Sequence, residues 1–167
     1  MADDPLVALA ARVGQDCLAV GANLATVESC TGGLIGHLLT ETPGSSAYYI
    51  GGFVTYSDAA KRTMVGVPAE VLEAHGAVSA QVARAMATGC RERTGADIGV
   101  SVTGIAGPDG GSSAKPVGLT YVAVADAAGI EVRRFTWTGS RADNKRASAQ
   151  AALELVLERM AAPAGRP

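Results

Sequence analysis

Aromatic residues are scarce in this chain of 167 residues, at 4% of the composition. Because 48% of the residues are hydrophobic, a sizeable core is still expected, built mainly from alanine, valine, leucine and isoleucine. Long apolar runs are also missing, since no stretch of 18 apolar residues occurs and two acids stand where a signal peptide carries basic residues. These absences predict a soluble, cytoplasmic protein without a membrane partner.

An excess of positive charge is missing as well. The formal net charge is −2, and no block of five or six like charges occurs. Because nucleic-acid phosphates are bound by a basic face, no nucleic-acid partner is expected. Three cysteines without Cys-x-x-Cys spacing exclude a disulfide framework and a zinc site. With only two histidines and no ligand cluster, we expect neither a metal nor another cofactor.

Periodic apolar positions and β-forming runs predict the order of elements. Gly and Pro mark the ends of most of them, and two glycines within 48–56 indicate a strand with a bulge. Helices are predicted over 5–21, 31–39, 59–64, 68–76, 79–94 and 141–161, and strands over 23–28, 48–56, 97–103, 118–126 and 130–137. Early alternation followed by a late hairpin predicts one three-layer α/β/α domain with a mixed β-sheet. This domain spans residues 1–167, with its core at about 5–160 and a disordered tail at 162–167.

Sites in open α/β sheets form where strand ends meet helix starts, and the segment Val-Glu-Ser-Cys-Thr-Gly-Gly (27–33) is placed there. Ser29 is a candidate nucleophile directly after a predicted strand. The N–H groups of Thr31, Gly32 and Gly33 are candidates to face an anion or a developing oxyanion. The alternative is that Ser29 or Thr31 only caps the following helix.

The segment Tyr-Ser-Asp-Ala-Ala-Lys (56–61) is the second of these positions. Lys61 falls in the first turn of a predicted helix, where the positive end of the helix dipole lowers the pKa of a lysine. A lysine that loses its proton near neutral pH is usable as a general base. Tyr56 ends the preceding strand and is a candidate to hold or relay a proton. The alternative is a solvated surface lysine and a packing tyrosine.

The third position is the loop that begins at Thr103-Gly-Ile-Ala-Gly-Pro-Asp-Gly-Gly. Its four glycines after a strand predict a loop rich in free N–H groups, which is typical of phosphate or sugar binding. The pattern is neither a Walker A loop nor a GxGxxG that opens a helix. A long surface turn is the alternative. Arg141 and Lys145 share a face of the last helix and form a second candidate for phosphate binding.

Cys30 supports an alternative hypothesis, in which its thiol is the nucleophile and His37 or His75 is the base. The predicted helix places His37 two turns from Cys30. His75 stands at a helix C-terminus, where an imidazolium is favourable for electrostatic reasons alone. The sequence leaves this thiol mechanism open as a minor alternative.

Five motifs occur together and in a fixed order. They are ESCTGG (28–33), GSSA (44–47), GGFVTYSDAAK (51–61), HGAVS (75–79) and SVTGIAGPDGGSSAKPVG (101–118). With these motifs, the sequence resembles the C-terminal domain of the competence/damage-inducible CinA proteins over about residues 5–160. The stand-alone form of that domain is a nicotinamide-nucleotide amidohydrolase.

The resemblance implies hydrolysis of the carboxamide of nicotinamide mononucleotide to nicotinate mononucleotide and ammonia, in pyridine-nucleotide recycling. It implies Ser29 as nucleophile, Lys61 as base and Tyr56 as a proton-handling partner, with Ser46 and Thr103 as supporting residues. Ser46 also remains a candidate nucleophile. The implied substrate-binding residues are Glu28, Cys30, Thr31, Gly32, Gly33, Ser46, Thr103, Gly104, Gly107 and Arg141.

Two departures from the family pattern fall in the region expected to bind phosphate. Ser140 stands where an acidic residue is common, and Lys145 stands where an arginine is usual. A catalytically weak nucleotide-binding module is therefore kept as the alternative function. Apolar surface on 48–54 and on the first helix predicts a homo-oligomer.

Overall fold

The computed structural model describes residues 4–162, and these form a five-stranded sheet with the order β2-β1-β3-β4-β5. The first three strands in this order are parallel, and β4 and β5 run antiparallel to their neighbours. The strands are β1 (Leu24–Glu28), β2 (Tyr49–Val54), β3 (Ile98–Gly104), β4 (Leu119–Asp126) and β5 (Gly129–Thr136). The helices are α1 (Pro5–Val20), α2 (Leu34–Thr40), α3 (Asp58–Val65), α4 (Ala69–His75), α5 (Ala80–Thr94) and α6 (Arg141–Ala161), with a short 3-10 helix η1 (Ser45–Ala47).

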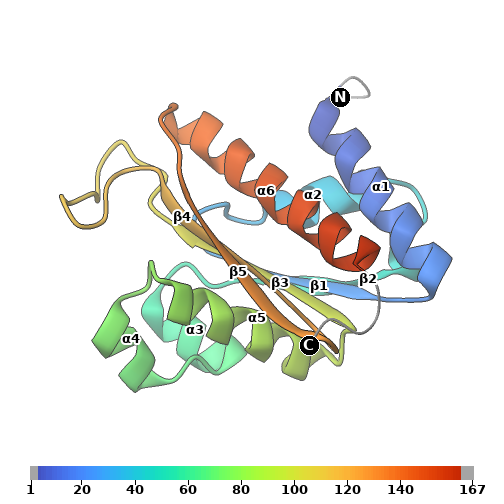
Figure 1. Ribbon diagram of the computed structural model, residues 1–167, viewed down its shortest axis with the longest axis horizontal. Coiled ribbons are helices and arrows are strands. Elements are labelled where there is room, and N and C mark those ends of the chain that lie inside the picture. Colours follow the sequence, from blue (N-terminus) through green and yellow to red (C-terminus); the bar gives the residue numbers. More distant parts are fainter. Residues whose placement is uncertain (1–3, 163–167) are drawn as a thin grey trace.

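Helices cover both faces of this sheet. Figure 1 shows α1, α2 and α6 above the sheet and α3, α4 and α5 below it. The predicted three-layer α/β/α domain with a mixed sheet is therefore confirmed. The predicted bulge in β2 is confirmed by a register shift opposite Leu24 and Ala25. The predicted tail falls almost entirely outside the described residues.

Small residues let α5 pack closely on the sheet, which is how a chain with few aromatic residues reaches a dense core. Ala83 and Ala87 of α5 lie against Ala123 and Ala125 of β4, all nearly inaccessible to solvent. A Cβ atom added at Gly89 would lie 1.7 Å from the carbonyl oxygen of Val65, so only glycine fits where α3 meets α5. Among the described helices, none combines the length and the apolar character that a membrane crossing requires.

The starts of α2 and α3 differ from their predictions in an informative way. Helix α2 begins at Leu34, three residues later than expected, because Gly33 adopts φ +99°, outside the helical region. Helix α3 begins with Asp58 as its first residue, and the capping side chain is that of Ser57, whose Oγ accepts a hydrogen bond from Ala60 N–H. Helix α6 has the predicted bounds, and Ser140 caps it in a reciprocal pair with Asp143. The departure at Ser140 therefore supplies a helix cap.

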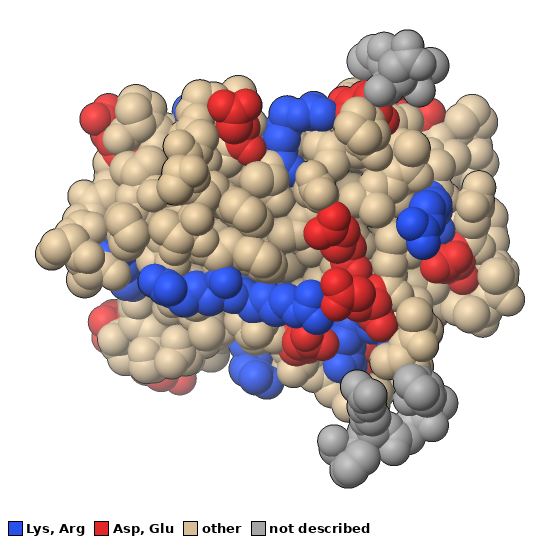
Figure 2. All heavy atoms as spheres, turned by 45° about the horizontal axis from the view of Figure 1, so that its top comes forward, with Lys and Arg blue, Asp and Glu red and all other residues tan. Residues whose placement is uncertain are grey.

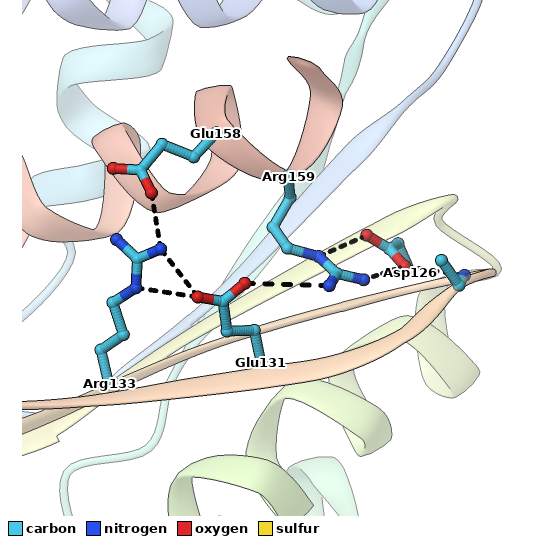
Figure 3. Close-up of polar contacts among 6 residues, drawn as sticks. Asp126, Glu131, Arg133, Glu158 and Arg159 are labelled. Atoms are coloured by element: carbon cyan, nitrogen blue, oxygen red, sulfur yellow. Dashed lines mark hydrogen bonds and ion pairs between the residues drawn. The ribbon is translucent and has the colours of Figure 1, made fainter. Parts of the chain in front are cut away.

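Ion pairs join the β4–β5 hairpin to the C-terminal half of α6 (Figure 3). The Arg159 guanidinium donates two hydrogen bonds to the Asp126 carboxylate, at 2.6 and 2.9 Å. Arg133 contacts both Glu131 and Glu158. Figure 2 shows a band of basic side chains on this side of the molecule that ends against acidic ones. The edge strand β5 thus carries charges of both signs.

Candidate active site

Ser29 lies at the carboxyl end of β1, in the turn that leads to α2. Its N–H donates to the carbonyl oxygen of Val102 in the neighbouring strand β3, at 2.9 Å, which fixes the start of the turn. Its side chain is 8% exposed. The residue at the N-cap of α2 is Gly33, and neither the Ser29 nor the Thr31 side chain accepts a hydrogen bond from the first turn of the helix, so the reading in which Ser29 or Thr31 serves as the helix cap is wrong.

Lys61 is the polar partner of Ser29. Its Nζ lies 3.1 Å from Ser29 Oγ and donates to the carbonyl oxygen of Thr55 at 2.8 Å. Lys61 is 1% exposed although it carries an amine, which contradicts the reading as a solvated surface lysine. Burial lowers the pKa of Lys61, and the nearby charge of Asp58 opposes this shift only in part. A lowered pKa was expected from the helix dipole, but burial is its main cause here.

Glu28 has a structural role that the sequence did not predict. Its carboxylate, 1% exposed, accepts hydrogen bonds from the N–H groups of Gly33, Ile35 and Gly36 at 2.9–3.1 Å. A carboxylate at the start of α2 also compensates the helix dipole. These contacts occupy Glu28, which caps α2 from the end of the preceding strand β1 and is not among the residues that line the cavity beside Ser29.

The donors available to an oxyanion differ from those expected. The N–H of Gly33 is used by Glu28, and the N–H of Gly32 donates to the carbonyl oxygen of Ser29 at 3.0 Å. The N–H groups of Cys30 and Thr31 donate to no oxygen within residues 4–162. Of these two donors, that of Cys30 belongs to a residue that lines the cavity beside Ser29. The Thr31 hydroxyl is buried and has no partner among the described residues.

A cavity of about 260 Å³ opens beside Ser29 Oγ, on the side where the 105–118 loop projects at the left of Figure 1. Ligand sites for small molecules commonly measure about 300–1,000 Å³, so this cavity fits the reactive end of a ligand better than a whole nucleotide. Thr103 lines it with its hydroxyl donating to the carbonyl oxygen of Ala77. The predicted site residues that line it are Ser29, Cys30, Tyr56, Lys61, Thr103, Gly104, Gly107 and Arg141.

Arg141 bridges the two walls of this cavity. Its Nη1 donates to the carbonyl oxygen of Gly107 at 2.7 Å, and its Nη2 donates to the Tyr56 hydroxyl at 2.9 Å. Tyr56 is 61% exposed, so it is not the buried packing residue of the alternative reading. Its hydroxyl has no direct hydrogen bond to Ser29 or Lys61. Tyr56 therefore stands at the opening of the cavity, beside Arg141.

Asn144 is a positioning residue beside the site that sequence reasoning missed. It is 2% exposed, its Nδ2 donates to the carbonyl oxygen of Ala106, and its Oδ1 accepts from Gly139 N–H. These contacts hold the glycine-rich loop against the first turn of α6. The only signal in the sequence was a polar residue, Asn144, on the apolar side of the predicted last helix. That signal does not show which backbone groups the asparagine contacts.

A second, more basic cavity adjoins the first through Arg141. It measures about 410 Å³ and is lined by Leu34, Arg141, Ala142, Lys145 and Arg146. The Lys145 ammonium approaches Gly32, where an added Cβ would lie 3.7 Å from Nζ. Three basic side chains of α6 thus line this cavity, although Arg146 is already paired with Asp4 at 2.7 Å.

Ser46 does not reach this site within its own chain. It lies in η1, before β2 begins, whereas Ser29 follows the end of β1. Because β1 and β2 are parallel, these two positions lie at opposite ends of the sheet, separated by the length of a six-residue strand, about 20 Å. The assignment of Ser46 as a supporting residue or nucleophile of its own chain's site is therefore wrong.

The thiol mechanism finds no base in the structure. Burial raises the pKa of Cys30 to about 11, which keeps its thiol protonated at neutral pH. His37 lies on the solvent side of α2 near Glu41, and His75 is exposed at the end of α4. Neither imidazole lines the cavity that holds Cys30.

Replacing Cys30 by alanine is expected to change the rate of any hydrolysis at this site by less than about tenfold, because loss of an essential nucleophile costs far more. The measurement is kcat for amide hydrolysis by Cys30→Ala beside the wild type. A loss of about a thousandfold or more in a folded variant would restore the thiol mechanism.

Other regions offer fewer reactive groups. Within residues 4–162, no three histidine, cysteine, aspartate or glutamate side chains gather in a way that could hold a metal ion. A larger cavity of about 590 Å³ lies beside α5 and is lined mainly by apolar and small residues, with no serine or cysteine among them. The Ser29 cavity is smaller, but its lining brings together a serine hydroxyl and a buried lysine amine within hydrogen-bonding distance.

The comparisons with known proteins decide the family. The model of the CinA C-terminal domain matches residues 6–160. The chain belongs to the CinA C-terminal domain family. The CinA-like protein of Chloroherpeton thalassium is 50% identical over 151 residues, which is 88% of this chain and 36% of that protein. The CinA-like protein of Geobacter sulfurreducens is 50% identical over 140 residues, with 84% and 34% covered. The chain thus spans about a third of the length of these CinA relatives.

Solved structures of CinA proteins share the whole fold. The competence/damage-inducible protein CihA of Agrobacterium tumefaciens has a TM-score of 0.91 and 43% identity, and the match covers 93% of this chain and 95% of that one. A CinA superfamily protein of Klebsiella pneumoniae has a TM-score of 0.90 and 36% identity, with 93% and 98% covered. The CinA resemblance predicted from the five motifs is therefore confirmed.

Proposed function

We propose that this CinA-family chain is an amidohydrolase that converts nicotinamide mononucleotide to nicotinate mononucleotide and ammonia, in pyridine-nucleotide recycling. One observation carries the proposal: a buried lysine amine, with its pKa lowered by burial, lies 3.1 Å from the hydroxyl of a serine that faces a cavity. A nucleotide-binding module needs neither a nucleophile nor a base, and burying an amine without use for it is costly.

In the proposed acylation step, the neutral Lys61 amine takes the proton of Ser29 Oγ, which attacks the carboxamide carbon. The carbonyl oxygen becomes an oxyanion, and the N–H groups of Cys30 and Thr31, which donate to no oxygen within residues 4–162, are the proposed donors to it. Lys61 then delivers its proton to the carboxamide nitrogen, the C–N bond breaks, and ammonia leaves. The Thr55 carbonyl oxygen orients the amine through both transfers.

In the proposed deacylation step, water takes the place of ammonia beside Lys61. The amine accepts a proton from the water, whose oxygen attacks the carbon of the Ser29 ester. The ester C–O bond breaks, and Lys61 returns its proton to Ser29 Oγ, which releases nicotinate mononucleotide. A single lysine thus acts as base and as acid in both steps, which agrees with the positions of both histidines away from the cavity.

The phosphate of the nucleotide is proposed to lie at the basic cavity that adjoins the reactive one. The Ser29 cavity is too small for the whole nucleotide, and Arg141 belongs to the linings of both cavities. A phosphate there meets the guanidinium of Arg141 and the ammonium of Lys145, which bind it by charge-assisted hydrogen bonds. Lys145 keeps this charge at the position where the family usually carries an arginine.

Replacing Arg141 by alanine is expected to raise the KM for nicotinamide mononucleotide by about 10–100-fold, because a hydrogen bond to a charged group contributes about 1.5–3 kcal/mol. The expected fall in kcat is smaller, since Arg141 does not touch Ser29 or Lys61. Arg134→Ala, which removes an exposed arginine of β5, is the matched control and leaves both constants unchanged. A KM unchanged by Arg141→Ala would place the phosphate elsewhere.

The proposed reaction is tested by incubating the purified chain with nicotinamide mononucleotide, the riboside without phosphate, and nicotinamide. Chromatography of the products and an ammonia assay are expected to show nicotinate mononucleotide and ammonia in equal amounts, with the mononucleotide as the best substrate. Binding of the nucleotide by calorimetry without any turnover would instead support the nucleotide-binding module.

A further inference from the structure

The segment HGAVS (75–79), which leads from α4 to α5, forms one wall of the cavity beside Ser29 through Ala77 and Val78. Three successive carbonyl oxygens of this segment each accept a hydrogen bond from a side chain. The carbonyls of His75, Gly76 and Ala77 accept from the Lys115 ammonium at 2.6 Å, the Ser79 hydroxyl at 2.9 Å and the Thr103 hydroxyl at 2.8 Å. Two of these donors belong to β3 and to the cap of α5, so they fix the wall to the body of the domain. The third donor comes from the glycine-rich loop.

The glycine-rich loop forms another wall of the same cavity, and few side chains hold it in place. Among the described residues, three side-chain hydrogen bonds join residues 106–117 to the helices. Two of them come from Arg141 and Asn144 of α6, and both reach the first two residues of this range. The third is made by Lys115, near the end of the range, and it reaches the last residue of α4. Lys115 therefore ties the loop to the wall formed by Ala77 and Val78, and Figure 1 places α4 and the loop at the same end of the sheet.

The local structure around Lys115 favours this contact. The N–H of Lys115 donates to Ser112 Oγ at 3.0 Å, and the N–H of Ser112 donates to the carbonyl oxygen of Lys115 at 2.8 Å, which closes a tight turn. The lysine is partly buried and lies against Gly76, where an added Cβ would be 2.9 Å from Nζ. Carbonyl groups in the last turn of a helix have no partner within the helix, and the helix dipole attracts a cation to them. The ammonium of Lys115 therefore suits the carbonyl of His75, the last residue of α4.

We propose that Lys115 is a positioning residue of the site, which clasps the glycine-rich loop to the end of α4 and so fixes two walls of the cavity before a ligand binds. Lys115 is not among the residues that line the cavity beside Ser29 or the adjoining basic cavity, so it acts through the loop. A loop that is already ordered costs less free energy to bind to, so the clasp increases affinity for the nucleotide. The effect on the substrate rests on the proposed function, whereas the clasp itself does not.

Hydrogen exchange tests the clasp without any activity measurement. Lys115→Met keeps the length of the side chain and removes its hydrogen-bond donors. We expect the amides of residues 106–115 to exchange about tenfold faster in this variant, the effect of losing one hydrogen bond to a charged group, because the loop opens more easily. The amides of β3 are expected to exchange as in the wild type. Unchanged exchange of the loop in Lys115→Met would overturn the clasp.

A substitution at Gly76 tests the same contact from the other side. Gly76 has φ +73° and an added Cβ would lie 2.9 Å from Lys115 Nζ, so Gly76→Ala displaces the ammonium as well as straining the backbone. Gly95 has φ +71° at the end of α5 with nothing within 4 Å of an added Cβ, so Gly95→Ala is the matched control for strain alone. Both variants are expected to lower Tm, and only Gly76→Ala is expected to speed exchange in the loop. Equal loop exchange in the two variants would contradict the clasp.

Steady-state kinetics with nicotinamide mononucleotide test the positioning role. Lys115→Met is expected to raise KM about tenfold and to change kcat less than about threefold, because Lys115 contacts neither Ser29 nor Lys61. Lys115→Arg keeps the charge and the donors, so it is expected to restore most of the wild-type KM and the slow exchange of the loop. Arg134→Met, at an exposed position of β5, is the control for the loss of a positive charge and leaves KM unchanged. A fall in kcat at an unchanged KM would overturn the positioning role.

The failure of this proposal and the failure of the proposed function give different results. If the wild type releases no ammonia, the proposed function fails, and hydrogen exchange still decides whether Lys115 clasps the loop. If the wild type releases ammonia and Lys115→Met has the wild-type KM, the positioning role fails and the proposed function stands.

Discussion

Replacing Lys61 by alanine is expected to lower kcat for ammonia release from nicotinamide mononucleotide by about 10²–10⁴-fold, the contribution of a positioned general base and acid. Lys61 Nζ is the group within hydrogen-bonding distance of Ser29 Oγ that can both take and return a proton. KM is expected to change little, because Lys61 lines the cavity beside Ser29 and not the adjoining basic cavity proposed to bind the phosphate. The measurement is steady-state ammonia release with purified protein.

Lys61→Arg is the matched control for this prediction. A guanidinium keeps the positive charge and most of the length, but it does not lose its proton in proteins, so this variant is also expected to be inactive. A rate above about a tenth of the wild type in either variant would show that another group is the base.

Thermal unfolding checks that Lys61→Ala and Lys61→Arg fold. The same measurement as a function of pH tests whether the Lys61 amine is buried in the wild type. The folded-state pKa of Lys61 is lowered, so the unfolded chain holds more protons between that value and the usual value of a lysine. The free energy of unfolding should therefore rise with pH across this interval in the wild type. This rise should disappear in Lys61→Met, in which no amine is buried.

Replacing Ser29 by alanine is expected to lower kcat by about 10³–10⁶-fold, because no acyl intermediate forms without the hydroxyl. Binding of the nucleotide is expected to persist, since the Ser29 hydroxyl is small and the basic cavity remains. The measurement is ammonia release together with calorimetric binding. Ser113→Ala, which removes an exposed serine of the glycine-rich loop, should leave the rate unchanged.

Activity retained in Ser29→Ala would show that Ser29 is not the nucleophile, although Lys61 could still be the base. A residual rate above about a tenth of the wild type would then point to water attacking the carboxamide directly, with Lys61 as the base. In that case the cavity and its free N–H groups would remain the site, but the acylation step would be wrong.

Strong local signals explain why most of the fold could be predicted. Helix α6 and the β4–β5 hairpin have long periodic patterns and clear end signals, and their predicted bounds agree with the structure to within one residue. Helix α2 was placed too early because its cap, Glu28, belongs to the preceding strand. A cap of this kind depends on the conformation of the turn between residues 29 and 33. No sequence pattern predicts that conformation.

The candidate site was predictable only as a set of segments. Parallel strands β1 and β2 end at the same edge of the sheet, which is why the turn after one meets the helix after the other. The 3.1 Å contact between Lys61 and Ser29 joins residues 32 positions apart, and it depends on the rotation of α3 that buries Lys61. The resemblance to the family named Ser46 as a site residue, but a motif carries no information about distance, and the structure places Ser46 at the end of the sheet opposite Ser29.

The most direct test of the account is the pH dependence of kcat/KM for ammonia release by the wild-type chain. We predict that kcat/KM rises with pH through one ionisation whose pKa lies well below that of an exposed lysine, because burial favours the neutral amine of Lys61. The same profile for Lys61→Arg should lack this ionisation at its much lower rate. An unshifted lysine ionisation, or a profile that is identical in Lys61→Arg, would contradict a buried Lys61 as the base that activates Ser29.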